Sequence, residues 1–251
     1  MARKSKFQGQ CYYCGNPSYS REHAPPDSMF KGFDCDRITV PSCDKHNTSK
    51  SGDDQAIVNA FLIPLYKGLG KYILEGDVIQ AIENAKSSFP YVKRKALSTP
   101  FLIDPPELTS DLPDVSHLVP SVDIYAWIRQ LTAALVHNAT QAFDSTINWE
   151  AALAQSPDWF GTGGELPQKI EQSQSRLVHN TDIRNQYEQL GWKIGWSATP
   201  RKYPLAIYAF QVHINEPEVF FKHRFYTKYT WYVRFSASHE TISGLQKRIS
   251  L

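Results

Sequence analysis

The chain has 251 residues, of which 41% are hydrophobic and 13% aromatic, and its formal net charge is +2. That length allows one large domain or two small ones, and no stretch approaches the roughly 20 apolar residues of a membrane-spanning helix. The basic first residues have no apolar segment behind them, so we expect a cytoplasmic protein without membrane partners.

All four cysteines fall within the first 43 residues, in a segment rich in turn formers and poor in core residues. Cys11 and Cys14 form a CxxC pair, and after 28 intervening residues Cys43 and His46 form a CxxH pair. Two closely spaced ligand pairs can complete the four tetrahedral positions of zinc. A segment this short of apolar residues needs such a staple to fold, so we predict a structural zinc bound by these four residues.

Two alternatives to this ligand set remain at this point. The thiols could be unrelated cytosolic cysteines beside a surface histidine. Cys35 is a competing fourth ligand, although a single buried thiol is more often part of the packing.

Within the loop that this zinc would close lies the pair Glu22-His23, and Asn47 directly follows the ligand His46. A zinc with four protein ligands has no open position and serves structure only. A carboxylate, an imidazole and an amide oxygen that converge suit a hard divalent cation together with a general base.

The three motifs "CYYCG", "REHAPP" and "VPSCDKHN" together resemble the pattern of HNH endonucleases. The resemblance covers residues 8–66 and implies the ββα-metal fold. In that fold the first strand of a hairpin ends at His23, the second contains "RITVP", and a helix begins near Cys43.

By this resemblance His23 is the general base, and Glu22 and Asn47 hold one catalytic Mg²⁺ or Mn²⁺ ion. The implied activity is DNA endonuclease or nickase, on double-stranded DNA and in defence against invading DNA. The chain departs from the family in using His46 as the fourth zinc ligand. It also has no asparagine in residues 24–42 for the family's middle position, and Asp36 near that position receives no role.

Apolar residues at helical spacing predict a helix from about residue 44 to residue 66. Asp54 would share a helix face with Asn47. It could support the site, hold Lys50 four positions earlier, or be a solvated carboxylate. A helical extension is expected over residues 67–98.

Five prolines over residues 98–120 indicate an extended connector, which we place at 99–120. The remainder, 121–251, is predicted to be an α+β accessory domain for DNA binding, dimerisation or regulation. Within it, residues 122–143 are predicted to form an amphipathic helix and 168–190 a second one. The aromatic, β-branched runs 202–214 and 225–237 are predicted to form paired strands.

The charge is uneven along the chain. Residues 99–200 carry 12 acidic against 5 basic side chains, whereas residues 201–251 carry 8 basic against 3 acidic. Basic, aromatic ends suit a nucleic-acid partner, although an aromatic sheet core with charged outer positions accounts for the same pattern. The fold class expected overall is α+β, with possible homodimers or defence-system partner proteins. The alternative function is a zinc-stapled nucleic-acid-binding module without nuclease activity.

Overall fold

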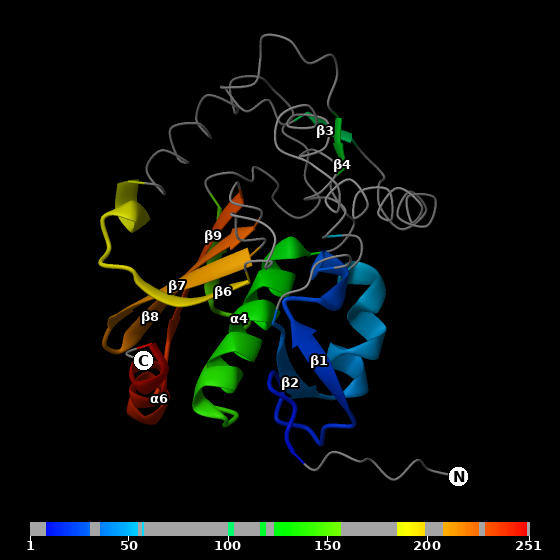
Figure 1. Cartoon of the computed structure of the whole chain (residues 1–251), viewed down its shortest axis with the longest axis horizontal. Helices are drawn as coiled ribbons and strands as arrows, with labels where there is room; N and C mark the ends of the chain where they lie inside the picture. Colours follow the sequence, from blue (N-terminus) through cyan, green and yellow to red (C-terminus); the bar gives the residue numbers. More distant parts are fainter. Residues whose placement is uncertain are drawn as a thin grey trace.

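The structure is a computed structural model, which describes residues 9–30, 36–54, 57, 100–102, 116–118, 123–156, 185–198, 208–225 and 229–249. Helices and antiparallel strands are mixed in the fold (Figure 1). The cysteine and histidine cluster belongs to its N-terminal part. The expected α+β class is therefore confirmed.

The N-terminal unit is built on an antiparallel hairpin of β1 (Ser20–Ala24) and β2 (Ile38–Ser42). Alternate residues of each strand are buried, as expected for a hairpin with one face against a core. The short 3-10 helix η1 (Asp27–Phe30) follows β1. The predicted hairpin is confirmed in both strands.

The segment after β2 is helical but starts less regularly than the sequence predicts. Two 3-10 turns, η2 (Asp44–His46) and η3 (Thr48–Lys50), precede α-helix at residues 51–54. The backbone of Asn47 breaks the run, with φ −129° and ψ −80°. Apart from residue 57, the rest of the predicted helix to residue 66 and all of 67–98 lie outside the described residues.

The predicted connector contains a short antiparallel pair, β3 (Pro100–Leu102) with β4 (Ser116–Leu118). The remaining residues of 99–120 lie outside the described part of the chain. Of the helix predicted over 168–190, the structure describes only the end, where residues 185–188 are helical.

Helix α4 (Ile124–Thr140) confirms the amphipathic helix predicted from residue 122. Its N-terminus is capped by the carboxylate of Asp123, which accepts hydrogen bonds from the backbone N–H groups of Tyr125 and Ala126 at 2.9 and 3.0 Å. It ends at Gln141, whose left-handed backbone (φ 57°) caps the last turn.

A five-stranded antiparallel sheet forms the C-terminal unit, in the order β5-β9-β8-β7-β6. The strands are β5 (Leu153–Gln155), β6 (Lys193–Ala198), β7 (Tyr208–Asn215), β8 (Glu218–Phe225) and β9 (Tyr229–Ser236). The two predicted strands are β7 and β9, but they do not pair with each other. Strand β8 lies between them and pairs with both, which corrects the expectation.

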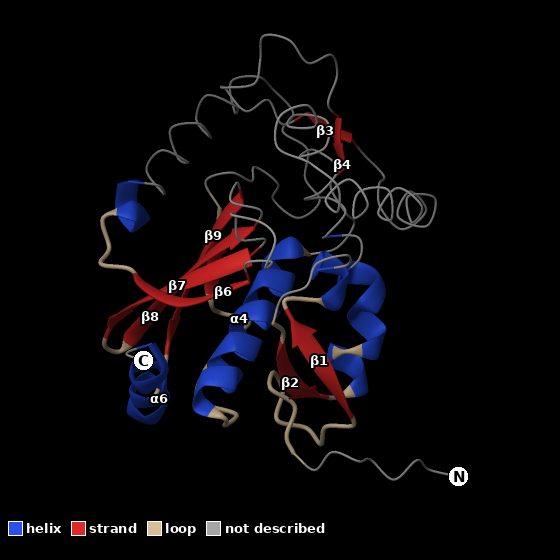
Figure 2. Ribbon diagram, viewed as in Figure 1, coloured by secondary structure: helices blue, strands red, loops and turns tan. Residues whose placement is uncertain are grey.

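Helix α4 lies between the hairpin and the sheet, and α6 (His239–Ile249) packs beside it (Figures 1 and 2). The indole N–H of Trp127 donates to Asp54 at 2.7 Å on the hairpin side. On the sheet side the hydroxyl of Thr132 lies 3.0 Å from the Nε2 of His223. Buried residues from the hairpin, α4 and the sheet belong to one continuous core. Packing against the sheet therefore holds α4 in position, and packing against α4 holds the hairpin in position.

Many aromatic side chains of the C-terminal strands are buried in this core. Trp231, Tyr208 and Phe225 are fully buried, so their rings are not accessible for stacking on bases. The sheet therefore follows the alternative of an aromatic core with charged outer positions. None of the helices in the described part of the chain is long and apolar enough to cross a membrane.

Candidate metal centre and active site

The four predicted zinc ligands lie close together at the open end of the hairpin, where β1 begins and β2 ends. Cys11 and Cys14 lie on the turn before β1, and Cys43 and His46 follow β2. Their ligand atoms all lie within 4.8 Å of one another. This Cys₃His cluster can hold a metal ion such as zinc.

Three of the six spacings between the ligand atoms are close to the edges of a zinc tetrahedron. The Sγ atoms of Cys14 and Cys43 are 3.8 Å apart, and the Nδ1 of His46 lies 3.6 Å from the Sγ of Cys11 and 3.3 Å from that of Cys43. With Zn–S near ~2.3 Å and Zn–N near ~2.0 Å, the expected edges are about 3.8 Å for S–S and about 3.5 Å for S–N. The residues present therefore fit zinc, and Nδ1 is the histidine atom that would bind it.

The turn that carries Cys11 and Cys14 depends on Gly15. The N–H of Gly15 donates to the carbonyl of Cys11 at 3.0 Å, and its φ of +70° is in the left-handed region that favours glycine. On the other side, the N–H of His46 donates to the carbonyl of Cys43 at 3.1 Å, so the 3-10 turn folds the imidazole back toward the thiol.

The thiols of Cys11 and Cys14 differ in pKa, and therefore in how readily each loses the proton that a metal ion would replace. Burial raises the pKa of Cys11, but hydrogen bonds from His46 and from three backbone groups outweigh it and bring the pKa to about 6. Burial and the neighbouring Cys11 thiolate raise the pKa of Cys14 to about 11. Metal binding therefore displaces a proton from Cys14. Cys35 lies outside the described residues.

Tyr13 links the Cys₃His cluster to the rest of the protein. Its ring centroid lies 4.8 Å from that of His46, and its hydroxyl donates to Glu150 at 3.1 Å. Because Glu150 follows α4, this contact connects the Cys₃His cluster to the C-terminal unit.

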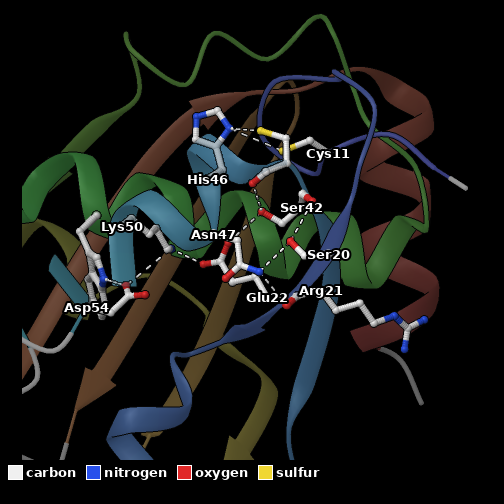
Figure 3. Close-up of polar contacts among 11 residues, drawn as sticks. Cys11, Ser20, Arg21, Glu22, Ser42, His46, Asn47, Lys50 and Asp54 are labelled. Atoms are coloured by element: carbon white, nitrogen blue, oxygen red, sulfur yellow. Dashed lines mark hydrogen bonds and ion pairs between the residues drawn. The ribbon is translucent and has the colours of Figure 1, made fainter. Parts of the chain in front are cut away.

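Glu22 lies on the buried face of the hairpin, with 5% of its surface exposed. One carboxylate oxygen is ion-paired with the ammonium of Lys50, and the other accepts a hydrogen bond from Ser42 at 3.4 Å (Figure 3). Burial raises its pKa to about 7, Lys50 opposes this rise, and the charge of Asp54 adds to it. Lys50 was missed from the sequence as a partner of Glu22, although a carboxylate on a buried strand face requires a nearby cation.

His23 lies on the opposite face of the hairpin from Glu22. Consecutive strand residues point to opposite faces, and His23 is half-buried beside its cross-strand partner Thr39. The structure therefore does not bring the two side chains onto one face, and their catalytic roles stay predictions.

Asn47 connects the helical segment to β1. Its amide nitrogen donates to the hydroxyl of Ser20 at 2.8 Å and to the carbonyl of Arg21 at 3.0 Å (Figure 3). The amide is thereby held beside the strand that carries the Glu-His pair.

The side chain of Asp54 is largely buried, with 13% of its surface exposed. Its carboxylate lies 3.7 Å from the ammonium of Lys50 and accepts the 2.7 Å hydrogen bond from Trp127. Of the three possibilities left open by the sequence, the contact with Lys50 is the one found. Lys50 thus lies between two carboxylates, Glu22 and Asp54.

The residues predicted for the catalytic ion do not fit it in this arrangement. Magnesium needs accessible oxygen ligands and keeps several waters. Both oxygens of Glu22 are engaged and buried, and an ammonium group already balances their charge. The amide of Asn47 is committed through its nitrogen to β1.

Comparison of the chain with models of protein families, with curated proteins and with solved structures gave no match.

Proposed function

We propose that the protein is an HNH-type endonuclease that hydrolyses phosphodiester bonds of DNA, with His23 as general base and zinc as a structural staple. The observation that carries this proposal is the contact of Asn47 with β1, at Ser20 and the Arg21 carbonyl. It supports a compact unit in which a hairpin, a Cys₃His cluster and a helical segment follow in the order that the resemblance implies.

The chemistry assigned to this chain centres on His23. Its imidazole accepts a proton from water while the water oxygen attacks phosphorus. The bond from phosphorus to the 3′ oxygen breaks, and that oxygen takes up a proton from solvent. An imidazole titrates near neutrality, which suits it to this task.

The resemblance also implies a divalent ion, which in such reactions offsets charge on the phosphate and on the leaving oxygen. Because Glu22 is paired with Lys50, we assign no step to that ion. The plasmid-nicking experiment tests whether the reaction requires Mg²⁺ or Mn²⁺.

A second candidate is a zinc-stapled nucleic-acid-binding module without nuclease activity. The ion pair of Glu22 with Lys50 favours it, since a carboxylate balanced by a lysine can serve stability alone.

Plasmid nicking separates the two candidates. Supercoiled DNA is incubated with the zinc-loaded protein without added metal, with Mg²⁺ and with Mn²⁺. We expect nicking by the native protein and a loss of about 10²–10⁴-fold in His23→Ala, the usual contribution of a general base. His239→Ala is the matched control, because His239 is an exposed histidine at the start of α6.

Glu22→Gln tests the ion separately. A higher metal requirement in this variant would support a role as ligand, whereas an unchanged metal requirement would exclude it. Equal nicking by the native protein and His23→Ala would refute the base, and DNA binding without any nicking would establish the binding module.

A further inference from the structure

The five-stranded sheet has a second face, opposite the one that packs on α4. On β8, His223 points toward α4, where its ring lies 3.0 Å from Thr132. Side chains alternate between the two faces of a strand, so Phe220 and Lys222 belong to the opposite face, which we call the outer face. Tyr232 of β9 lies on the outer face as well, because it is the cross-strand partner of Lys222. The C-terminal strands therefore place aromatic rings and a cation outside the core.

The residues just before β6 cover part of the outer face. We call residues 185–192 the strap; they follow one another in yellow in Figure 1. The ring of Tyr187 stacks on that of Tyr232, with centroids 4.6 Å apart and 13° between the planes. The carboxylate of Glu188 accepts hydrogen bonds from the ammonium of Lys222 at 2.6 and 2.7 Å and from the Tyr232 hydroxyl at 2.7 Å. The strap thus puts a flat ring on a ring and, next to it, an anion on a cation.

Lys222 depends on that anion. Only 7% of its surface is exposed, and its ammonium lies 5.7 and 6.0 Å from the ring centroids of Trp192 and Tyr232. A lysine so far removed from water is costly without a counter-charge. Its partner Glu188 has 44% of its side-chain surface exposed, so solvent reaches the ion pair from the side of the strap.

The strap is separable from the main core. Tyr187 forms a small cluster with Phe220 and Tyr232, which Leu190 and Trp192 border, and this cluster is distinct from the core that joins the hairpin, α4 and the sheet. Residues 185–192 belong to no strand. Lifting the strap therefore breaks neither the pairing of the strands nor the main core.

We propose that the outer face binds single-stranded nucleic acid, with a base stacked on Tyr232 and a phosphate on Lys222, and that the strap occupies both positions in the unbound protein. A nucleotide joins a flat π-face to an anion, which is the combination that Tyr187 and Glu188 present. Aromatic rings with a cation beside them bind unstacked bases of single strands, whereas a duplex keeps its bases stacked. The basic excess of residues 201–251, 8 against 3, favours a polyanion.

This surface goes beyond the proposed function. It lies on the far side of the sheet from α4, and it adds a site for a single strand to either candidate, the nuclease or the binding module. Nothing in it depends on His23 or on a catalytic ion.

Binding of a fluorescein-labelled oligothymidylate tests the proposal. The zinc-loaded protein carries His23→Ala, so that the DNA stays intact, and no divalent metal is added. Glu188→Gln should strengthen binding about tenfold, because it keeps the shape of the strap but removes the charge that competes for Lys222. Glu240→Gln, at an exposed glutamate in the first turn of α6, makes the same change in net charge and should leave the affinity unchanged.

A second substitution identifies the phosphate contact. In the Glu188→Gln background, Lys222→Met should abolish the gain. It should also reduce the slope of log K against log salt by about 0.7, the value for one phosphate contact to a single strand. This double variant leaves neither member of the pair charged, so it avoids the cost of a buried unpaired charge. Lys247→Met, at an exposed lysine in the last turn of α6, is the control in the same background and should keep the gain.

Hydrogen exchange tests the displacement of the strap. The backbone N–H of Leu190 donates to the carbonyl of Tyr187 at 3.2 Å, and the indole N–H of Trp192 donates to the same carbonyl at 2.8 Å. Deuterium uptake in residues 185–192 should rise when the oligothymidylate binds. Unchanged or slower uptake there would refute the displacement.

Four other results would overturn the proposal: no binding of the oligothymidylate, equal effects of Glu188→Gln and Glu240→Gln, a gain that survives Lys222→Met, and displacement of the DNA by polyglutamate of equal charge. The last would assign the face to an acidic peptide. Dimerisation of Glu188→Gln in light scattering, without a gain in DNA binding, would assign it to the strap of a second copy and would also overturn the proposal. Plasmid nicking by the native protein is measured separately, so the outer face can fail while the nuclease stands, and the reverse.

Discussion

The ammonium group of Lys50 is paired with the carboxylate of Glu22 on the buried face of the hairpin. Both side chains are almost entirely removed from water, and Asp54 approaches the same ammonium from the next helical turn. This pairing holds the helical segment against β1, and it also occupies the carboxylate on which a catalytic ion would depend. The same contact therefore stabilises the fold and makes the carboxylate of Glu22 unavailable to a catalytic ion.

Removal of Lys50 should be strongly destabilising, because it leaves two buried carboxylates without a cation. We expect Lys50→Met to lower the free energy of unfolding by about 3–5 kcal/mol, the usual cost of breaking a buried pair. The double variant Lys50→Met with Glu22→Gln should regain a large part of this loss, since the amide carries no charge. Urea unfolding at neutral pH measures both. Equal stability of the native protein and Lys50→Met would show that the pair contributes little. Equal stability of the single and double variants would show that the unpaired charge of Glu22 does not cause the loss.

The N-terminal unit could be predicted largely from the sequence because its signals are local. Ligands at fixed short spacing, a β-branched run near Val40 and the apolar helical periodicity after residue 50 each indicate one element. The partner of Glu22 could not be predicted from such local signals. Lys50 is 28 residues away in sequence, and only the packing of the helical segment on β1 brings it close.

The C-terminal sheet was harder to predict for a different physical reason. Along β8, residues on both faces are buried: Phe221 and His223 face the core, while Phe220 and Lys222 are covered on the other side. The strand therefore lacks the alternation that marks a half-exposed strand. The opposite faces of Glu22 and His23 follow from strand geometry alone, so that relationship was available from the sequence once the strand was placed.

Metal analysis should find about one zinc per chain in protein purified without added zinc. Cys43→Ser should lose zinc and unfold or aggregate, because the binding free energy of such a site is folding free energy. Mass spectrometry under native conditions and thermal unfolding measure the two effects.

Cys35→Ser is the matched control for that experiment and should keep both zinc and stability. Loss of zinc in Cys35→Ser, with zinc retained in His46→Ala, would show that the fourth ligand is Cys35 and not His46. A folded, zinc-free Cys43→Ser protein would refute the structural role of the metal.

The fully buried His223 should make the protein sensitive to acid. Burial lowers its pKa from the ordinary 6.5 to about 3, and its two ring nitrogens lie 2.7 Å from the Tyr208 hydroxyl and 3.0 Å from that of Thr132. Between these two pKa values the unfolded chain binds a proton that the folded protein excludes. This contribution is therefore present in full above about pH 6.5 and is lost progressively as the pH falls toward 3.

His223→Leu should remove that contribution. At pH 7 we expect it to cost about 1–3 kcal/mol, because Tyr208 loses its hydrogen-bond partner. The difference in unfolding free energy between native protein and variant should then shrink as the pH is lowered from 7 to 5. Glu22, with its raised pKa, changes stability in the opposite sense but is present in both proteins and cancels in this difference. A difference that is constant across this range would contradict the assignment.

Gly15→Ala should damage the metal centre through the backbone. A Cβ at this position would lie 2.6 Å from the ring of Phe143, and the φ of +70° disfavours any residue other than glycine. The left-handed conformation costs an alanine about 1–2 kcal/mol, and overpacking adds about 1–3 kcal/mol. We therefore expect a loss of about 2–5 kcal/mol in unfolding free energy with zinc bound. Zinc should also be released at a lower chelator concentration, since this turn presents Cys11 and Cys14.

Gly191→Ala is the matched control, because a Cβ there meets nothing within 4 Å, and it should change stability by less than about 1 kcal/mol. Equal effects of the two substitutions on stability and on zinc release would show that the turn at Gly15 does not control the ligand geometry.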